Sequence, residues 1–304
     1  MLIGVSSYNQ ELYDSLLVEL SEKLNILPDK PEEAPENTLK ALWSLAKGKP
    51  VSAERARDYV PESLTDKEQE KLKGCIQSRL AGVPLAHISE RQCFLGLELL
   101  AGPEALIPRK ETELLASTAI DVLRERISGE LAHVIDVCTG AGNVAMAIAS
   151  QIEHAKVYAA DISEDAVVLA RRNCELLGLC DRVQLHSGDL LEPFRELQLN
   201  NKVDIITCNP PYISSAKVPA MADEIAGHEP QMAFDGGIFG VNLMRRLISE
   251  TPDFLTSGGY LVFEVGLGQG PPLQKQMSKM PEYSTVEAVQ DVEGNARVIV
   301  ARAN

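Results

Sequence analysis

Four apolar runs in the middle of the chain each lead to a polar residue, and this recurrence constrains the fold more than any other feature. The segments between the runs have the composition of helices. In an open parallel sheet the carboxyl ends of the strands meet at one edge, where ligands bind. The pattern therefore predicts an α/β fold with a doubly wound, Rossmann-like sheet. It also predicts a ligand site at the ends of these strands, formed by Asp136, Asp161, Asp189 and Asn209.

Residues 134–149 give the clearest part of this pattern. An apolar run meets a loop that contains Gly140 and Gly142, and a run of small apolar residues typical of a helix follows. Glycines at these positions let a ligand approach the backbone. The dinucleotide pattern G-x-G-x-x-G is not met, because Cys138 and Ala145 stand in place of two of its glycines. A pyrophosphate-binding loop is therefore not expected here.

The acids at the strand ends indicate which ligand to expect instead. Asp136 would repel phosphate and attract the cationic part of a ligand. Asp161 stands where nucleotide-binding α/β sheets hold the ribose hydroxyls. S-Adenosylmethionine carries an ammonium, a sulfonium and a ribose but no phosphate. We therefore expect S-adenosylmethionine to be the cofactor.

The tetrapeptide Asn209-Pro210-Pro211-Tyr212 follows the fourth run. Its prolines fix φ and remove two backbone donors, so nearby carbonyls are free to accept hydrogen bonds from a substrate. The side-chain carbonyl of Asn209 adds an acceptor, and Tyr212 adds an aromatic face. This combination suits an amide or amino nitrogen, whose protons the acceptors would hold while the ring covers its planar group. The alternative is a plain Pro-Pro turn after a strand.

These motifs together resemble the HemK-type N5-glutamine methyltransferases that modify peptide-chain release factors. The resemblance rests on the cofactor loop, the strand ending at Asp161 and the tetrapeptide, and it extends over roughly residues 82–304. Further segments that agree are residues 106–114, Glu229-Pro230 with residues 234–237 and Gly240, residues 258–266 with Gln269, and residues 291–302.

The resemblance implies an S-adenosylmethionine-dependent N-methyltransferase that acts on a side-chain amide, such as glutamine in a release factor. It implies no metal. The implied catalytic residues are Asn209, Pro210 and Tyr212. The implied cofactor-binding residues are Asp136, Thr139, Gly140, Gly142, Asn143, Asp161, Ile162, Asp189, Leu190 and Asn209. The implied substrate-binding residues are Pro108, Arg109, Pro211 and Glu229.

Several positions depart from the family pattern. His87 stands where a tyrosine is usual, Glu90 and Cys138 stand where glycines are usual, and Asn143 adds an amide that would face the pocket. These departures leave open an enzyme of secondary metabolism, which would methylate a small-molecule amine or amide or cyclise the cofactor's own aminobutyryl chain. A binding protein without catalysis is disfavoured, because it has no use for free acceptors beside a sulfonium.

Composition narrows the partners. The tetrapeptide also resembles that of DNA adenine methyltransferases, but 29 basic residues face 44 acidic ones and the net charge is −15. We therefore expect no nucleic-acid partner. The doublets Arg171-Arg172 and Arg245-Arg246 are expected on solvated helix faces.

Hydropathy and the pattern of cysteines predict the cellular compartment of the protein. No apolar run reaches about 18 residues, and the first residues lack the basic start of a secretory signal, so neither a membrane nor export is expected. Six cysteines occur without a C-x-x-C pair. Cys138, Cys174 and Cys208 are expected in strands or helices as buried thiols of a reducing cytoplasm. The sequence leaves the oligomeric state open.

The first part of the chain predicts a separate helical domain over residues 1–81, which would receive the substrate or cover it as a lid. Leu12, Leu16, Leu20 and Leu24 form one apolar stripe. A helix is expected over residues 38–47 with Trp43 in the core, and Thr65 to Glu68 predicts a capping box. Residues 82–105 are expected to be a linker that could form a β-hairpin. Residues 106–304 are expected to be the catalytic domain.

Overall fold

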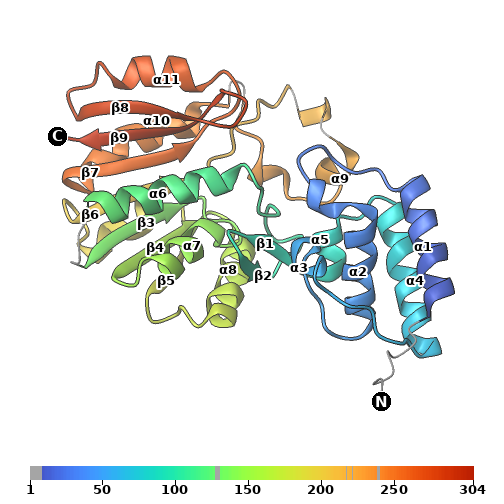
Figure 1. The fold of residues 1–304 in the computed structure, drawn as a ribbon. Helices are drawn as coiled ribbons and strands as arrows, with labels where there is room; N and C mark the ends of the chain where they lie inside the picture. Colours follow the sequence, from blue (N-terminus) through green and yellow to red (C-terminus); the bar gives the residue numbers. More distant parts are fainter. Residues whose placement is uncertain (1–8, 127–130, 217, 221, 238–239) are drawn as a thin grey trace. The chain divides into compact units, whose positions relative to one another are not determined.

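The computed structural model describes residues 9–126, 131–216, 218–220, 222–237 and 240–304. The chain divides into two compact units (Figure 1). One comprises Met1–Pro103 with Ala222–His228, and the other comprises Glu104–Met221 with Glu229–Asn304. We call them the helical unit and the sheet unit. The short segment 222–228 thus belongs to the helical unit although it lies far along the chain.

The helical unit packs its helices around one apolar core. Leu16 and Leu20 are buried, and Leu12 and Leu24 pack against the same cluster at lower burial, which confirms the stripe. Trp43 is fully buried in this core, as predicted, and its indole N–H donates to the Glu62 carbonyl at 2.8 Å. The elements are α1 Gln10–Lys23, η1 Pro31–Glu33, α2 Pro35–Ala46, α3 Ala53–Ala56, α4 Asp66–Leu80, α5 Leu85–Ser89, β1 Gln92–Phe94, β2 Leu97–Leu99 and α9 Asp223–Ala226.

Local signals set the helix boundaries. The predicted capping box is present at α4, because Thr65 Oγ1 accepts from the Glu68 N–H and the Glu68 carboxylate accepts from the Thr65 N–H. Helix α2 begins at Pro35, three residues before the predicted start, since proline suits the first turn of a helix. Strands β1 and β2 form an antiparallel pair joined by Leu95 and Gly96, both with positive φ.

The sheet unit is built on one seven-stranded sheet of order β5-β4-β3-β6-β7-β9-β8. Strands β3 to β7 pair in parallel, and β8 and β9 add antiparallel pairs. This is the predicted doubly wound, Rossmann-like fold. The strands are β3 Ala132–Val137, β4 Ala155–Asp161, β5 Val183–Ser187, β6 Val203–Cys208, β7 Leu255–Glu264, β8 Tyr283–Gln290 and β9 Ala296–Ala303.

Helices cover both faces of this sheet (Figure 1). Helix α6 contacts β6, β7 and β9, α7 contacts β3, β4 and β5, α8 contacts β4 and β5, and α11 contacts β8 and β9. The remaining elements are short and connect strands. The elements of the sheet unit outside the strands are α6 Thr112–Arg126, α7 Asn143–Gln151, α8 Glu164–Leu177, η2 Glu192–Leu197, η3 Val218–Ala220, η4 Gln231–Ala233, α10 Asn242–Glu250, η5 Thr251–Asp253 and α11 Gly270–Met277.

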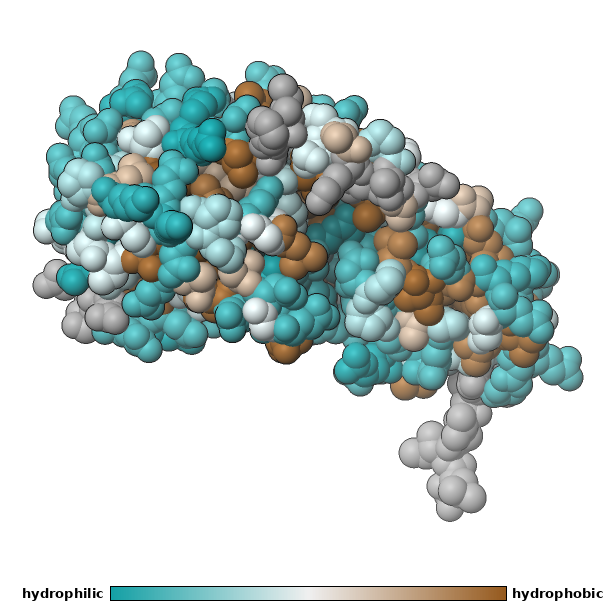
Figure 2. Space-filling view, turned by 90° about the horizontal axis from the view of Figure 1, so that it is seen from above, coloured by the Kyte–Doolittle hydropathy of each residue, from teal (hydrophilic) through white to brown (hydrophobic). Residues whose placement is uncertain are grey.

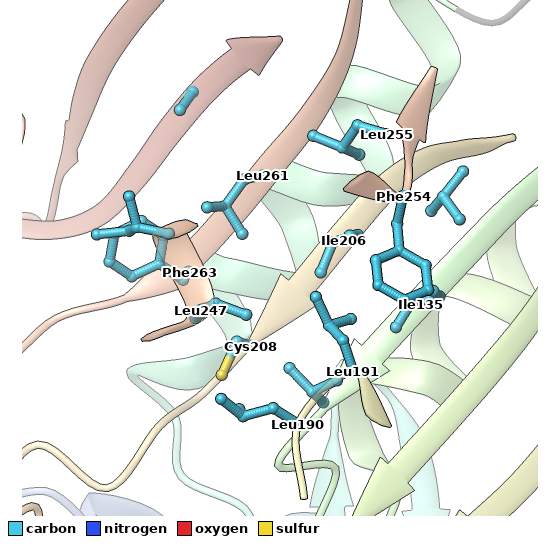
Figure 3. Close-up of a cluster of buried hydrophobic side chains, with 14 of the residues drawn as sticks. Ile135, Leu190, Leu191, Ile206, Cys208, Leu247, Phe254, Leu255, Leu261 and Phe263 are labelled. Atoms are coloured by element: carbon cyan, nitrogen blue, oxygen red, sulfur yellow. The ribbon is translucent and has the colours of Figure 1, made fainter. Parts of the chain in front are cut away.

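One apolar cluster fixes the end of β6 that carries the tetrapeptide. Ile206 and Cys208 point from β6 into the cluster, where Leu247 of α10 and Phe263 of β7 pack beside them (Figure 3). All four side chains are fully buried. The end of β6 therefore sits on a close-packed base, and the residues after it start from a fixed point.

The visible surface is mainly hydrophilic. On the face that Figure 2 shows, hydrophilic residues dominate, with hydrophobic ones interspersed among them. Within the described ranges, no helix is both long and apolar enough to cross a bilayer.

Candidate active site

A cavity of about 490 Å³ lies in the sheet unit at the carboxyl ends of β3, β4 and β6. The parallel pairing of these strands with β5 and one another confirms that Asp136, Asp161, Asp189 and Asn209 gather at one sheet edge. Most of the predicted site residues line this cavity. They are Pro108, Arg109, Asp136, Thr139, Gly140, Asn143, Asp161, Ile162, Asp189, Leu190, Asn209 and Pro211.

Asp136 is a buried carboxylate without a cation. It is 1% exposed, and its two oxygens accept from the hydroxyls of Thr139 at 2.6 Å and Thr207 at 2.7 Å. Burial raises its pKa to about 6, although both hydroxyl hydrogen bonds act to lower it. Among the described residues no Lys, Arg or His pairs with it. The site thus holds a negative charge that a cationic ligand would neutralise.

Asp161, the last residue of β4, fixes the loop after β3. Its oxygens accept from the backbone N–H groups of Gly140 at 2.9 Å and Ser163 at 3.0 Å. Burial raises its pKa, and these backbone hydrogen bonds act in the opposite direction. A carboxylate has about four lone-pair sites and the Ile162 N–H also interacts with this one, so Asp161 can still accept from a ligand.

The loop between β3 and α7 follows a left-handed path. Cys138, Gly140 and Gly142 all have positive φ, and a Cβ at Gly142 would crowd Ala170 and Met146. Cys138 therefore lies outside β3 and is only half-buried, which corrects the prediction that it is a buried strand thiol. Its left-handed backbone turns the chain out of the sheet. Cys174 and Cys208 are buried in α8 and β6 as predicted, and all six cysteines are free.

Asp189 differs from the other two acids because it has a cation. Arg246 of α10 donates to it at 2.9 Å, and also reaches Glu250 at 3.4 Å. The Arg246 side chain is 48% exposed, as predicted for a solvated helix face, yet it lines the cavity. Sequence reasoning missed this contact.

Asn209, the residue after β6, is half-buried and has one end of its amide tied to the protein. Its Nδ2 donates to Oγ1 of Thr112, the first residue of α6, at 3.1 Å. Among the described residues no donor reaches Oδ1. The acceptor end of the amide is therefore the end that remains for a ligand.

Tyr212 is held on the other side of the tetrapeptide. Its hydroxyl donates to Glu264 at 3.0 Å and accepts from Arg297 at 3.3 Å, and the guanidinium also lies 5.9 Å from the ring centroid. Burial, followed by the Glu264 carboxylate, raises the pKa of Tyr212. Neither Tyr212 nor the buried Pro210 lines the cavity. The predicted packing of the Tyr212 ring on a substrate stays a prediction.

A loop that contains Gly236 and Gly240 packs closely against the tetrapeptide. The Gly236 N–H donates to the Ile213 carbonyl at 2.7 Å, and a Cβ at Gly236 would clash with the Pro211 carbonyl. A Cβ at Gly240, which has φ of 65°, would clash with the Tyr212 carbonyl. Gln269 Nε2 donates to that carbonyl at 3.0 Å. Glycine is therefore required at positions 236 and 240, because a larger residue would clash with the backbone of the tetrapeptide.

Arg109 and Glu229 form an ion pair at the edge of the site. Glu229 Oε1 accepts from Arg109 Nη2, and Oε2 accepts from the Ile107 N–H at 2.9 Å. Glu229 is buried and does not line the cavity, nor does Gly142, whereas Arg109 does. Arg109 Nη1 is buried and has no hydrogen-bond partner among the described residues.

Sequence reasoning missed Thr112, Glu264 and Arg297 as members of this site. Glu264 ends the apolar run of β7, which is the pattern that identified Asp161, so the same signal could have found it. Thr112 had no local signal.

The residues present fit S-adenosylmethionine. The cavity has the size of a small-molecule site. Asp136 and Asp161 offer buried carboxylates without cations, which match a sulfonium, an ammonium and a ribose diol. No Lys or Arg cluster for a polyphosphate lines this cavity among the described residues, where the lining cations are Arg109 and Arg246.

Comparison with known proteins gives the family. The model of the methyltransferase small domain matches residues 112–288. The release factor glutamine methyltransferase of Geobacter sulfurreducens is 33% identical over 274 residues, which cover 89% of this chain and 92% of that protein. The enzyme of the same name from Gloeobacter violaceus is 34% identical over 250 residues, which cover 82% and 85%.

A solved structure supports the fold. The catalytic domain of hMettl16 superimposes with a TM-score of 0.53 at 15% identity, covering 78% of this chain and 82% of that one. At this identity the likeness concerns the fold alone. From its sequence relatives, the chain belongs to the release factor glutamine methyltransferase family and is an S-adenosylmethionine-dependent methyltransferase.

Proposed function

We propose that this enzyme methylates the side-chain amide nitrogen of a glutamine in a peptide-chain release factor. Family membership supports the protein substrate, because the relatives carry that activity in their names. The observation that carries the proposal is the state of Asn209. Its Nδ2 is occupied by Thr112, and its Oδ1 is free to accept a proton of an incoming amide.

The residues act mainly by alignment. When bound, S-adenosylmethionine supplies a methyl group that its sulfonium has already activated. Asp161 would hold the ribose hydroxyls and Asp136 would balance positive charge in the cavity. Asn209 Oδ1 and the Pro210 carbonyl would accept the two protons of the target NH₂ and so aim the nitrogen lone pair. Pro211 and Arg109, which line the cavity, would contact the substrate.

Tyr212 enters the proposal as the anchor of the tetrapeptide. Three hydrogen bonds support this role. The Tyr212 hydroxyl donates to Glu264 and accepts from Arg297, and the Tyr212 carbonyl accepts from Gln269. The proposed domains are those predicted: a helical domain over residues 1–81 that receives the release factor, a linker over 82–105 and a catalytic domain over 106–304.

The net charge supports a protein substrate, and the free cysteines support a location in the cytoplasm. A net charge of −15 favours a protein acceptor over nucleic acid, since phosphates would be repelled. Six free thiols agree with a reducing cytoplasm.

The test is mass spectrometry of a purified release factor after incubation with enzyme and S-adenosylmethionine. We expect one methyl group on a glutamine side chain. Asn209→Ala should lower turnover roughly 100-fold while cofactor affinity stays within a few fold, because alignment is lost and the cofactor contacts remain. Asn200→Ala, at an exposed asparagine after η2, is the matched control and should match the wild type.

Two results would contradict the proposal. One is parallel loss of cofactor binding and turnover in Asn209→Ala, which would make Asn209 a cofactor ligand or a fold residue. The other is release of methylthioadenosine from cofactor alone without an acceptor, which would indicate cyclisation of the aminobutyryl chain.

A further inference from the structure

The side-chain amide of Asn209 can serve its proposed role in only one of its two orientations. A rotation by 180° exchanges Oδ1 and Nδ2, which have nearly the same shape but opposite hydrogen-bonding character. In the flipped orientation the cavity would receive a donor, which cannot accept a proton from an incoming amide. Some other group must therefore decide which end faces the cavity.

Thr112 is the group in contact with the buried end of that amide. Its Oγ1 lies 3.1 Å from Asn209 Nδ2, and its side chain is 1% exposed. A hydroxyl, however, can both donate and accept, so this contact alone would tolerate either amide orientation. The direction of the bond depends on where the Thr112 proton points.

Glu264 gives that proton a destination. This carboxyl group ends β7, is 1% exposed, and interacts with the Thr112 hydroxyl through a hydrogen bond. Burial raises the pKa of Glu264, whereas the hydrogen bond from Thr112, the Arg297 guanidinium 3.5 Å from Oε1 and the Tyr212 hydroxyl act in the opposite direction and favour the carboxylate. A carboxylate only accepts, so the Thr112 proton points to Glu264 and the Thr112 lone pair points to Asn209.

We propose that Thr112 and Glu264 are positioning residues for methyl transfer, and that together they fix the orientation of the Asn209 amide. The carboxylate of Glu264 takes the hydroxyl proton of Thr112, Thr112 Oγ1 accepts from Asn209 Nδ2, and Oδ1 is left for the acceptor amide. This inference rests on the proposed function of Asn209. The residues involved lie at the ends of β6 and β7 and at the start of α6, and together they orient one amide.

Thr112→Val tests the proposal because it keeps the shape of the side chain and removes the hydroxyl. We expect turnover to fall about 10-fold or more, since the Asn209 amide would lose its fixed orientation and with it the alignment of the acceptor nitrogen. The KM for the acceptor should change less than kcat, and calorimetric titration should give cofactor affinity within about 2-fold of the wild type. Thr112→Ser restores the hydroxyl and should return turnover to within about 3-fold of the wild type.

Thr118→Val is the matched control. Thr118 lies on the same helix, and its hydroxyl donates to the Leu114 carbonyl at 2.7 Å without touching the site. The same substitution there should leave kcat unchanged. If it lowers kcat as much as Thr112→Val does, the effect comes from damage to α6 and the proposal is wrong.

A double-mutant cycle with Asn209→Ala separates the positioning role of Thr112 from the proposed role of Asn209. If Thr112 acts through Asn209, adding Thr112→Val to Asn209→Ala should cause almost no further loss of turnover. Losses that multiply would overturn the proposal, as would full turnover in Thr112→Val or a failed rescue in Thr112→Ser. If Asn209→Ala itself keeps full turnover, the proposed function fails; if Asn209→Ala is impaired and Thr112→Val is not, only the positioning role fails.

Discussion

A buried charge cluster in the helical unit differs from the two buried acids at the ends of β3 and β4 in the sheet unit. In the helical unit, Arg79 donates to Glu33 at 2.8 Å and to Glu224 at 2.9 Å, and Lys30 donates to Glu224 at 2.9 Å. All four side chains are at most 8% exposed. We call these residues the charge quartet. It contains two cations and two anions, so its charge is balanced inside the protein.

The sheet unit leaves its buried acids unbalanced at the ends of β3 and β4. Asp136 and Asp161 accept hydrogen bonds from hydroxyls and backbone N–H groups, but no cation pairs with either among the described residues. Burial raises the pKa of both. In the quartet, burial raises the pKa of Glu33, whereas at Glu224 the attraction of Lys30 and Arg79 together outweighs burial and lowers it.

The difference in charge balance indicates that the quartet has a structural role and that Asp136 and Asp161 have a binding role. A balanced buried cluster is self-sufficient, and breaking it leaves an unpaired charge. An unbalanced buried carboxylate costs stability that only an incoming cation can restore. We therefore interpret the quartet as holding segment 222–228 to the helical unit, and we propose that Asp136 and Asp161 bind the cofactor.

The largest effect is expected from Arg79→Met, which leaves Glu33 and Glu224 with one cation. Unfolding of the helical unit should become easier by about 3–5 kcal/mol. Trp43, the single tryptophan of the chain, is buried in this unit, so its fluorescence during urea denaturation reports the transition. Arg124→Met, at an exposed arginine of the sheet unit, is the control and should change stability by less than about 0.5 kcal/mol. A loss no larger than the control's would show that the quartet has no structural role.

A gain in stability is expected from Asp136→Asn. The folded pKa of about 6 lies above the ordinary value of 3.8, so the folded protein binds this proton more tightly than the unfolded chain does. The charge therefore costs stability in full above pH 6, by about 3 kcal/mol at most, and the cost disappears as pH falls below 3.8. Urea denaturation followed by circular dichroism should show a more stable variant at pH 8 and a smaller difference at pH 5. A variant that is less stable at pH 8 would contradict the comparison.

The smallest effect is expected from Arg246→Gln, which removes the cation beside Asp189. Both side chains are more than a third exposed, so water screens the pair. The free energy of unfolding should change by less than about 1 kcal/mol. If Arg246→Gln lowers the free energy of unfolding as much as Arg79→Met does, burial does not determine how much these ion pairs contribute to stability.

Local and long-range features differed in how well the sequence predicted them. The positions of Asp161 and Asn209 at the ends of β4 and β6 and the capping box at Thr65 were predicted, because each depends on residues close together in sequence. The end of β3 was predicted one residue too late, since Cys138 lies outside the strand. The pairing of Lys30 with Glu224 spans 194 residues and that of Thr112 with Asn209 spans 97. No local pattern encodes such contacts, since they arise only when the folded chain brings distant segments together.

We propose that the buried carboxylate of Asp136 is neutralised by the positive charge of the bound cofactor. Calorimetric titration with S-adenosylmethionine at pH 6, in two buffers that differ in ionisation enthalpy, measures the protons exchanged on binding. A cation near Asp136 should lower its pKa, so the wild type should release a fraction of a proton that Asp136→Asn does not release, and affinity should rise with pH through 6 in the wild type alone. Equal proton exchange and equal pH dependence in the two proteins would contradict the account.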